Sequence, residues 1–155
     1  MIKRLFLLLY FSFISQNALA TEFVTLQCTG DRMIKQSLGS SMVKPFTDIY
    51  KIKFDENDPV IMVQKDDGTF VELEGGKKDT HDVYDCKSTN HHFKCNIVGI
   101  IALENGGEIN NKREIFLSRS DGRFTENNIT IIGSIVMQTV DEGVCKEVNE
   151  KSNLF

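Results

Sequence analysis

The chain has 155 residues, of which 41% are hydrophobic and 26% are charged, and its formal net charge is −4. This length suits one domain and is short for two. The acidic balance argues against a nucleic-acid partner, because such partners are bound by a basic face.

The first twenty residues have the three parts of a secretory signal peptide. A basic start is followed by a short apolar run at residues 5–14 and by the small residues Ala18 and Ala20. The apolar run is about half of the roughly 20 residues that a membrane-spanning helix needs. We therefore expect cleavage after Ala20, no membrane anchor after cleavage, and export of residues 21–155 as one domain to a periplasm or the medium.

Alternation of apolar and polar residues, and not a 3.6-residue period, dominates the rest of the chain. Short alternating runs bounded by turn residues are typical of half-buried strands. Asp-Gly pairs separate two pairs of these runs, which is a strong signal for hairpins. The expected strands are residues 22–28, 50–54, 60–63, 69–73, 83–87, 93–97, 98–103, 114–118, 123–125 and 129–138. The last is the longest and is apolar on both faces, so we expect it to be central.

Only two segments have features of a helix. Residues 33–43 have apolar side chains at near-helical spacing, but a Gly-Ser-Ser sequence interrupts them. Residues 145–153 suit either a short terminal helix or a loose tail. Little or no helix is therefore expected, and the pattern predicts a single all-β domain, folded as a small antiparallel barrel or a sandwich-like meander.

Four cysteines follow the signal segment, and an even number in a small exported domain indicates two disulfides. Cys86 and Cys95 lie on two expected strands joined by a short turn, so a hairpin brings them together. Cys28 lies in the first strand and Cys145 after the last, and the end strands of a closed or nearly closed meander are neighbours. We therefore predict Cys28–Cys145 and Cys86–Cys95. No spacing typical of a zinc or redox site is present.

The histidines are the candidates for a metal site. His81, His91 and His92 flank the expected Cys86–Cys95 hairpin, and Asp85 is close in sequence, so imidazole and carboxylate ligands are available. Adjacent residues of a strand point to opposite faces, so at most one of His91 and His92 can join His81. We expect exposed turn histidines and no bound metal.

Catalytic motifs are missing from the sequence. It contains no G-x-S-x-G elbow, no phosphate-binding loop and no dinucleotide fingerprint. Cysteines that are all oxidised offer no thiol nucleophile. We therefore predict no catalytic residue and no cofactor.

Four short motifs carry a resemblance to a known group of proteins. They are residues 26–30 (LQCTG), 50–55 (YKIKFD), 119–124 (RSDGRF) and 143–145 (GVC). In this spacing the chain resembles small exported bacterial proteins of uncharacterised function. The resemblance implies an all-β, disulfide-linked exported domain and carries over no activity.

A non-enzymatic binding module is the first functional hypothesis. It would be a soluble envelope protein or an inhibitor, with another envelope or extracellular protein as its partner. Loops on a rigid, disulfide-linked scaffold commonly present binding residues. The longest expected loop, residues 31–45, carries Met33, Ile34, Leu38 and Met42. These side chains are either an exposed recognition patch or part of a loop folded back over a barrel end, and burial is the expectation.

Two alternatives are kept. The first is a carrier of a small apolar ligand in a barrel interior, where Tyr50, Phe54, Phe70 and Phe93 would point inward. A filled core would use the same residues. The second is a small metal-dependent or hydrolytic enzyme, which the missing motifs make the weakest of the three.

Overall fold

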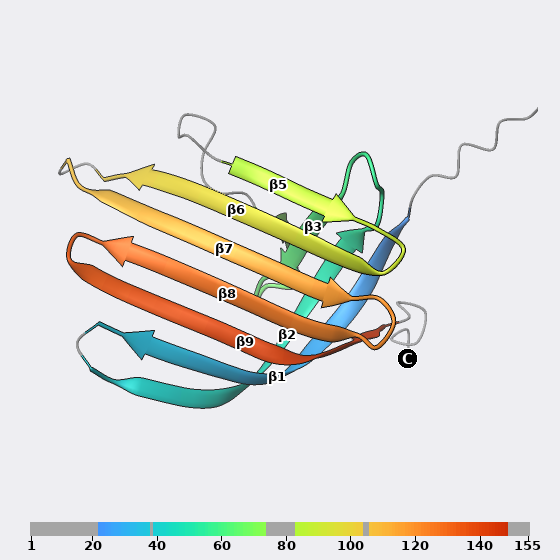
Figure 1. Cartoon of the computed structure of the whole chain (residues 1–155), viewed down its shortest axis with the longest axis horizontal. Helices are drawn as coiled ribbons and strands as arrows, with labels where there is room; N and C mark the ends of the chain where they lie inside the picture. The colour runs from blue at the N-terminus through green and yellow to red at the C-terminus, as the bar shows by residue number, and fades with distance from the viewer. Residues whose placement is uncertain (1–21, 38, 74–82, 104–105, 149–155) are drawn as a thin grey trace, which may run out of the picture.

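A computed structural model describes residues 22–37, 39–73, 83–103 and 106–148. The predicted signal peptide, Leu38 and His81 lie outside these described residues. Within them the chain forms nine strands and no helix (Figure 1). The strands are β1 (Phe23–Gln36), β2 (Ser41–Lys53), β3 (Val60–Gln64), β4 (Phe70–Glu72), β5 (Val83–Ser88), β6 (His92–Ala102), β7 (Glu108–Ser118), β8 (Arg123–Ile132) and β9 (Ile135–Glu147).

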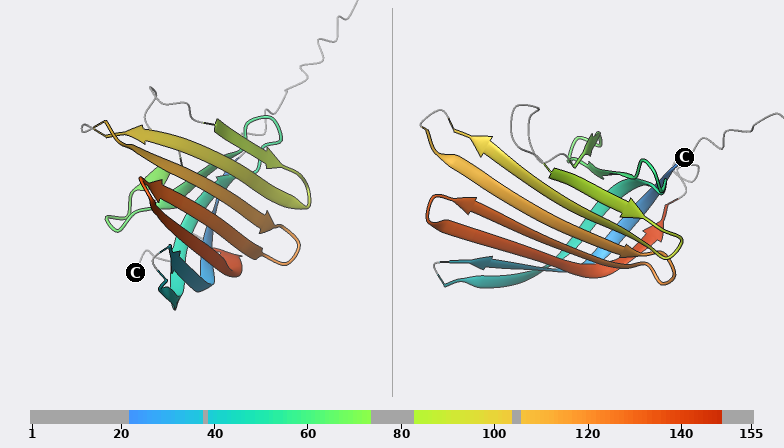
Figure 2. Two further views of the ribbon diagram at one scale, coloured as in Figure 1. Left: turned by 60° about the vertical axis from the view of Figure 1, so that its left-hand side comes forward. Right: turned by 45° about the horizontal axis from the view of Figure 1, so that its top comes forward.

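All nine strands belong to one antiparallel sheet with the order β4-β3-β2-β1-β9-β8-β7-β6-β5. The sheet curls into a half-barrel with one concave face (Figure 2). The predicted all-β meander is thus confirmed, with β4 and β5 as its two edges. The first and last strands are neighbours, as expected, but they pair in the middle of the sheet. No helix among the described residues has the length and apolar character needed to cross a membrane.

Two segment predictions are wrong. Residues 129–138 are not one central strand, because a two-residue turn at Gly133 separates β8 from β9. Residues 31–45 are neither a loop nor a helix, because β1 and β2 continue as a paired ladder from Phe23↔Lys53 to Lys35↔Ser41. In addition, the two runs expected at 93–97 and 98–103 are one strand, β6, and the segment from residue 145 continues β9 to Glu147.

Both predicted disulfides are confirmed. Cys28 lies opposite Cys145 in the β1–β9 ladder, with their Cα atoms 3.9 Å apart. Cys86 lies opposite Cys95 in the β5–β6 hairpin, with a Cα separation of 4.0 Å. One bridge therefore fixes the register in the middle of the sheet, and the other fixes it at an edge.

The hydrophobic core fills one end of the concave face. Its largest fully buried side chains include Tyr50, Phe93 and Phe124. Phe46 and Phe124 lie on the two sides of a glycine pair, Gly30↔Gly143, where β1 meets β9. A Cβ at either glycine would collide with backbone of the facing strand, so only glycine permits this close approach. The ring centroids of Phe46 and Phe124 lie 6.3 Å apart above the pair.

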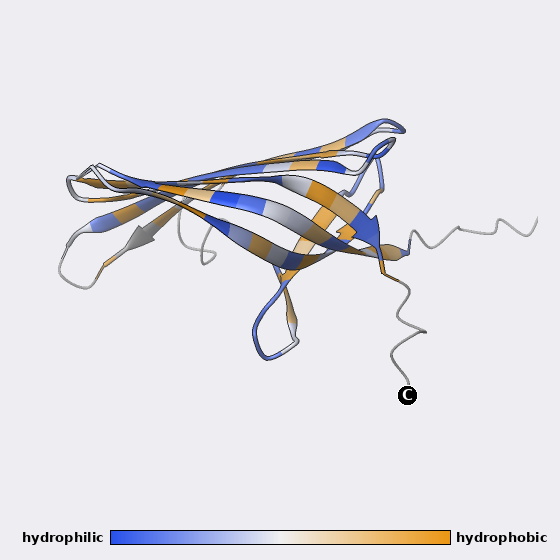
Figure 3. Ribbon diagram, turned by 90° about the horizontal axis from the view of Figure 1, so that it is seen from below, coloured by the Kyte–Doolittle hydropathy of each residue, from blue (hydrophilic) through white to orange (hydrophobic). Residues whose placement is uncertain are grey.

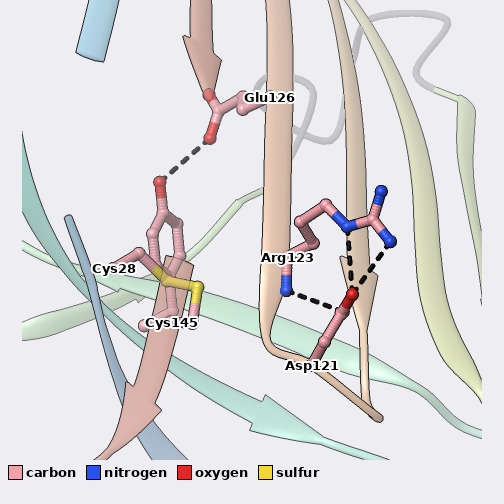
Figure 4. The surroundings of a disulfide bond; sticks show 6 residues. Cys28, Asp121, Arg123, Glu126 and Cys145 are labelled. Atoms are coloured by element: carbon pink, nitrogen blue, oxygen red, sulfur yellow. Dashed lines mark hydrogen bonds and ion pairs between the residues drawn. A yellow bond between two sulfur atoms is a disulfide. The ribbon is translucent and has the colours of Figure 1, made fainter. Parts of the chain in front are cut away.

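The turn in the predicted 119–124 motif contains another required glycine. Gly122 has a φ of 70°, which glycine adopts without strain. A Cβ there would also collide with the Cys145 carbonyl oxygen. Asp121 accepts hydrogen bonds from the Arg123 backbone and guanidinium, which closes the turn near the Cys28–Cys145 disulfide (Figure 4). The structural role of this motif therefore accounts for its residues.

Candidate functional site

Beyond the core, the concave face changes from apolar to charged. Side chains two residues apart on a strand share a face. From Cys28 this places Arg32 on the concave face, and the ladders set it opposite Asp141, which in turn is opposite Glu126. We call the following groups the charged cluster: Arg32, Asp48, Tyr50, Arg113, Glu126 and Asp141.

Arg32 joins two carboxylates from different strands. Its Nε and Nη2 atoms donate to the two carboxylate oxygens of Asp141 at 2.8 and 2.7 Å, and Nη2 also donates to Asp48 at 2.6 Å. Asp141 is only 2% exposed, and its two hydrogen bonds to Arg32 offset the free-energy cost of removing its charge from water. The hydrogen bond to Asp141 and the charges of both carboxylates raise the pKa of Arg32. The guanidinium therefore stays charged and links β1, β2 and β9.

Glu126, drawn in Figure 4, forms the second half of the charged cluster. It accepts a hydrogen bond from the Tyr50 hydroxyl at 3.0 Å, and its other oxygen lies 3.0 Å from Arg113 Nε. Burial raises the pKa of Glu126, and the Arg113 charge opposes that shift. Burial, followed by the charge of Glu126, also raises the pKa of Tyr50. In the charged cluster, two partly buried arginines thus contact three carboxylates that are partly or almost fully buried.

A hollow of about 260 Å³ adjoins the charged cluster. It is lined by Arg32, Ile34, Lys44, Arg113, Glu126, Asn128, Thr139 and Asp141. Asn128 lines the hollow, and Asn111 lies on β7 two residues before Arg113. The Oδ1 atoms of both asparagines are buried without a hydrogen-bond partner among the described residues. The hollow therefore offers charged and hydrogen-bonding side chains.

The far end of the sheet, where the β1–β2 and β8–β9 hairpins turn, is apolar and exposed. The two tips are joined because Ser37 N donates to Val136 O at 2.9 Å and Val136 N donates to Ser37 Oγ at 3.2 Å. Six large apolar residues there are between 37% and 64% exposed. We call these residues the distal patch, which covers both faces of the sheet at this end. Met42, Ile132 and Ile135 lie on the concave face, and Val43, Ile131 and Val136 lie on the convex face. Figure 3 shows hydrophobic stretches of ribbon at this end of the sheet.

The distal patch contains one of the predicted binding residues and adjoins two others. Met33 and Ile34 lie in β1, half-buried, opposite Val43 and Met42 respectively. The expectation that this segment is buried is wrong for Met42, which is 57% exposed. The reason is that the hairpin extends the sheet and does not fold back over a barrel end.

The predicted metal candidates do not come together in the described structure. Asp85 lies on β5, where its Oδ2 atom is 3.8 Å from Lys87 Nζ. His91 is exposed in the β5–β6 turn. His92 stacks on Phe116 with ring centroids 5.8 Å apart. In the described part of the chain, no group of three or more potential ligands is placed to hold a metal ion.

The aromatic set expected in a carrier is also divided. Tyr50 and Phe93 are buried in the core, and Phe54 packs edge-on against Phe93 at 6.1 Å. Phe70 lies apart from them on β4, with Lys51 Nζ 4.4 Å from its ring centroid. Tyr50 and Phe93 therefore belong to the filled core, whereas Phe54 lines a hollow of about 330 Å³.

Comparison of the chain with protein-family models, curated proteins and solved structures found no match.

Proposed function

We propose that the protein is an exported, non-enzymatic binding module that docks onto another exported protein through the distal patch. The observation that carries the proposal is the exposure of six large apolar side chains on two hairpins that are hydrogen-bonded to each other. Single exposed apolar residues are ordinary, whereas contiguous patches mark interaction sites. The two disulfides suggest an oxidising, non-cytoplasmic environment, which supports export.

Charge and side-chain type favour a protein partner with a particular surface. Residues 127–140 contain no charged side chain, and on the facing hairpin the charges between residues 33 and 47 are Lys35 and Lys44. An apolar partner surface bordered by carboxylates would complement this pattern. We take the partner to be a protein surface, because carboxylates on it would pair with Lys35 and Lys44 at the border of the patch.

The charged cluster supports this role as a rigid base for the hairpins. Arg32 connects β2, β1 and β9, and Arg113 and Tyr50 connect β7 and β2 to Glu126 on β8. Hydrogen-bonded buried groups hold neighbouring strands in one geometry. A patch that is already ordered loses less entropy when it binds.

The experiment compares two matched substitutions. Ile131 and Val136 face each other across the β8–β9 ladder on the convex face, and Ile131→Thr with Val136→Thr makes that face of the patch more polar while keeping β-branched residues. Val144→Thr is the control, because Val144 is a similarly exposed valine on the same strand outside the patch. Partners are captured from an exported-protein extract, identified and purified, and their dissociation constants are then measured by calorimetry.

We expect saturable binding to the wild type, a loss of at least about tenfold for the double variant, and no comparable loss for Val144→Thr. Equal binding by the double variant would overturn the proposal. So would the absence of any saturable protein partner. Flotation of the wild type, but not of the double variant, with phosphatidylethanolamine–phosphatidylglycerol vesicles would instead assign the patch to a membrane.

A further inference from the structure

The hollow beside the charged cluster is a space that the proposed function does not use. Its volume is about 260 Å³. A water molecule occupies roughly 30 Å³ in the liquid, so the hollow corresponds to about nine water molecules. Pockets for drug-sized ligands begin at about 300 Å³. The hollow therefore suits a smaller metabolite, of the size of a monosaccharide.

A row of polar side chains from three neighbouring strands lines this hollow. Arg113 of β7 lies opposite Asn128 of β8, which lies opposite Thr139 of β9. Directly opposite residues share a face, and neighbouring strands lie about 4.8 Å apart, so the row spans roughly 10 Å. The row lies on the concave face of the curled sheet (Figure 2), where side chains of successive strands converge.

Asn128 is the residue of this row that points to a ligand. Its Oδ1 atom is buried and has no hydrogen-bond partner among the described residues, and the same holds for Asn111, its diagonal neighbour on β7. Such an atom costs free energy until a donor reaches it. The last torsion of asparagine is broad, so rotation of the Asn128 amide can present Oδ1 to a molecule in the hollow. That molecule must carry hydrogen-bond donors.

The charges that line the hollow leave room for a negative group. Arg32, Lys44 and Arg113 line it together with two carboxylates, Glu126 and Asp141. Asp141 is paired with Arg32, and Glu126 is paired with Arg113. The negative charges of the lining are therefore already compensated.

A bound anion would meet positive charge without replacing either ion pair. Arg113 contacts Glu126 through Nε, and a guanidinium also donates from its Nη atoms. Lys44 is exposed and forms no ion pair within the described part of the chain. Asp48, the second carboxylate bonded to Arg32, is not a lining residue. A cationic ligand would instead face Lys44 without a compensating charge.

We propose that the hollow binds a small anion that also carries hydroxyl groups, of the sugar-acid or sugar-phosphate class. Its hydroxyls donate to Asn128 Oδ1 and exchange hydrogen bonds with the Thr139 hydroxyl, since a hydroxyl both donates and accepts. Its acid group lies at the Nη atoms of Arg113, and Lys44 adds positive charge at the rim. The two ligand classes share this chemistry and differ only in whether the acid group is a carboxylate or a phosphate.

This ligand site does not rest on the proposed function. The hollow and the distal patch have no residue in common. Ile131→Thr with Val136→Thr, the variant that tests protein docking on the convex face, should therefore leave ligand binding unchanged. Failure of one proposal is in this way distinguishable from failure of the other.

Calorimetry of the purified, disulfide-intact protein tests the ligand class with D-glucuronate, D-glucose 6-phosphate, D-glucose and acetate. We expect saturable binding of at least one of the first two. Glucose lacks the charge and acetate lacks the hydroxyls, so each should bind at least about tenfold more weakly. The tighter of the two anions identifies the acid group. No saturable binding of either anion up to about 10 mM would overturn the proposal, and so would equal binding of glucose.

Asn128→Leu tests the unpaired acceptor, and Asn127→Leu is its matched control. Asn127 is the preceding asparagine of β8, points to the convex face and accepts a hydrogen bond from Gln138. We expect Asn128→Leu to weaken binding of the anion at least about tenfold and Asn127→Leu to leave it unchanged. Equal dissociation constants for the two variants would overturn the proposal.

Lys44→Gln tests the charge at the rim, with Lys35→Gln as its control. Both lysines are exposed, but Lys35 is on the convex face of β1. Only Lys44→Gln should weaken binding of the anion, and the difference should shrink as salt is added. Equal effects of the two substitutions would overturn the charge assignment.

The side-chain amide of Asn128 gives a measurement that needs no variant. In nitrogen–proton correlation spectra of the wild type, its signals should shift as the bound anion is added, whereas those of Asn127 should not. Circular dichroism shows which variants are folded. An Asn128 signal that stays unchanged at saturation would overturn the proposal even if Asn128→Leu did not fold.

Discussion

Replacing Arg32 by Met tests how the charged cluster supports the sheet. The substitution removes two hydrogen bonds, of 2.8 and 2.7 Å, from Asp141, which is 2% exposed. Removing one partner of a buried ion pair typically costs 3–5 kcal/mol, because the other charge stays buried without compensation. The Arg32 side chain is itself 26% exposed, so water weakens the pair somewhat. We expect a loss of about 3 kcal/mol in the free energy of unfolding at pH 7.

The double variant Arg32→Met with Asp141→Leu is the control. Replacing both partners by apolar groups leaves no buried unpaired charge, so the double variant should be more stable than Arg32→Met alone.

Urea unfolding followed by circular dichroism, with both disulfides intact, measures these differences at pH 7. The coupling free energy comes from the cycle of the wild type, the two single variants and the double variant. A loss below about 1 kcal/mol for Arg32→Met would refute the role given to this ion pair. A double variant less stable than Arg32→Met would refute the desolvation argument.

Three other predictions follow from the same structure. Gly143→Ala should cost about 1–3 kcal/mol in urea unfolding, because its Cβ would meet the Thr29 carbonyl oxygen of the facing strand. Replacing both Cys28 and Cys145 by Ser should cost about 4–5 kcal/mol by the same measurement, because the bridge closes a loop with a sequence separation of 117. Burial raises the pKa of Glu126 above its ordinary value of 4.5, so the folded state keeps this proton to higher pH than the unfolded chain does. The contribution of Glu126 is therefore full below that ordinary value and is lost as the pH rises through the raised value. Glu126→Gln should remove this loss from the pH profile of unfolding.

The strands at the core end of the sheet could be predicted because one of their faces is exposed to solvent and the other is buried. In residues 50–54, for example, apolar residues alternate with lysines, and β2 contains residues 50–53 of this segment. The prediction failed at residues 31–45 and 129–138, where the hairpins carry apolar residues on both faces. Alternation disappears there, and the Gly133-Ser134 turn is not separated from its strands by polar residues.

Part of the charged cluster was within reach of the sequence. The predicted Cys28–Cys145 bridge fixes an antiparallel register between β1 and β9. In that register Arg32, four residues after Cys28, lies opposite Asp141, four residues before Cys145. A charged residue on the face that carries a buried disulfide is a signal of a buried ion pair. Glu126 could not be found in this way, because its position opposite Asp141 depends on the β8–β9 hairpin. Reading residues 129–138 as one strand removed that hairpin.

The position of the charged cluster explains why the distal apolar residues stay exposed. The core ends at Tyr50 and Phe124, whose ring centroids are 5.2 Å apart, and the Tyr50 hydroxyl already belongs to the charged cluster. Apolar side chains beyond the cluster cannot join the core without crossing buried charges, which would lose their partners. Their exposure is therefore fixed by the fold. Pairing of these hairpins does not require apolar side chains, because polar residues can form the same backbone ladder. Six exposed apolar side chains at one end of the sheet are therefore consistent with the proposed contact with another protein.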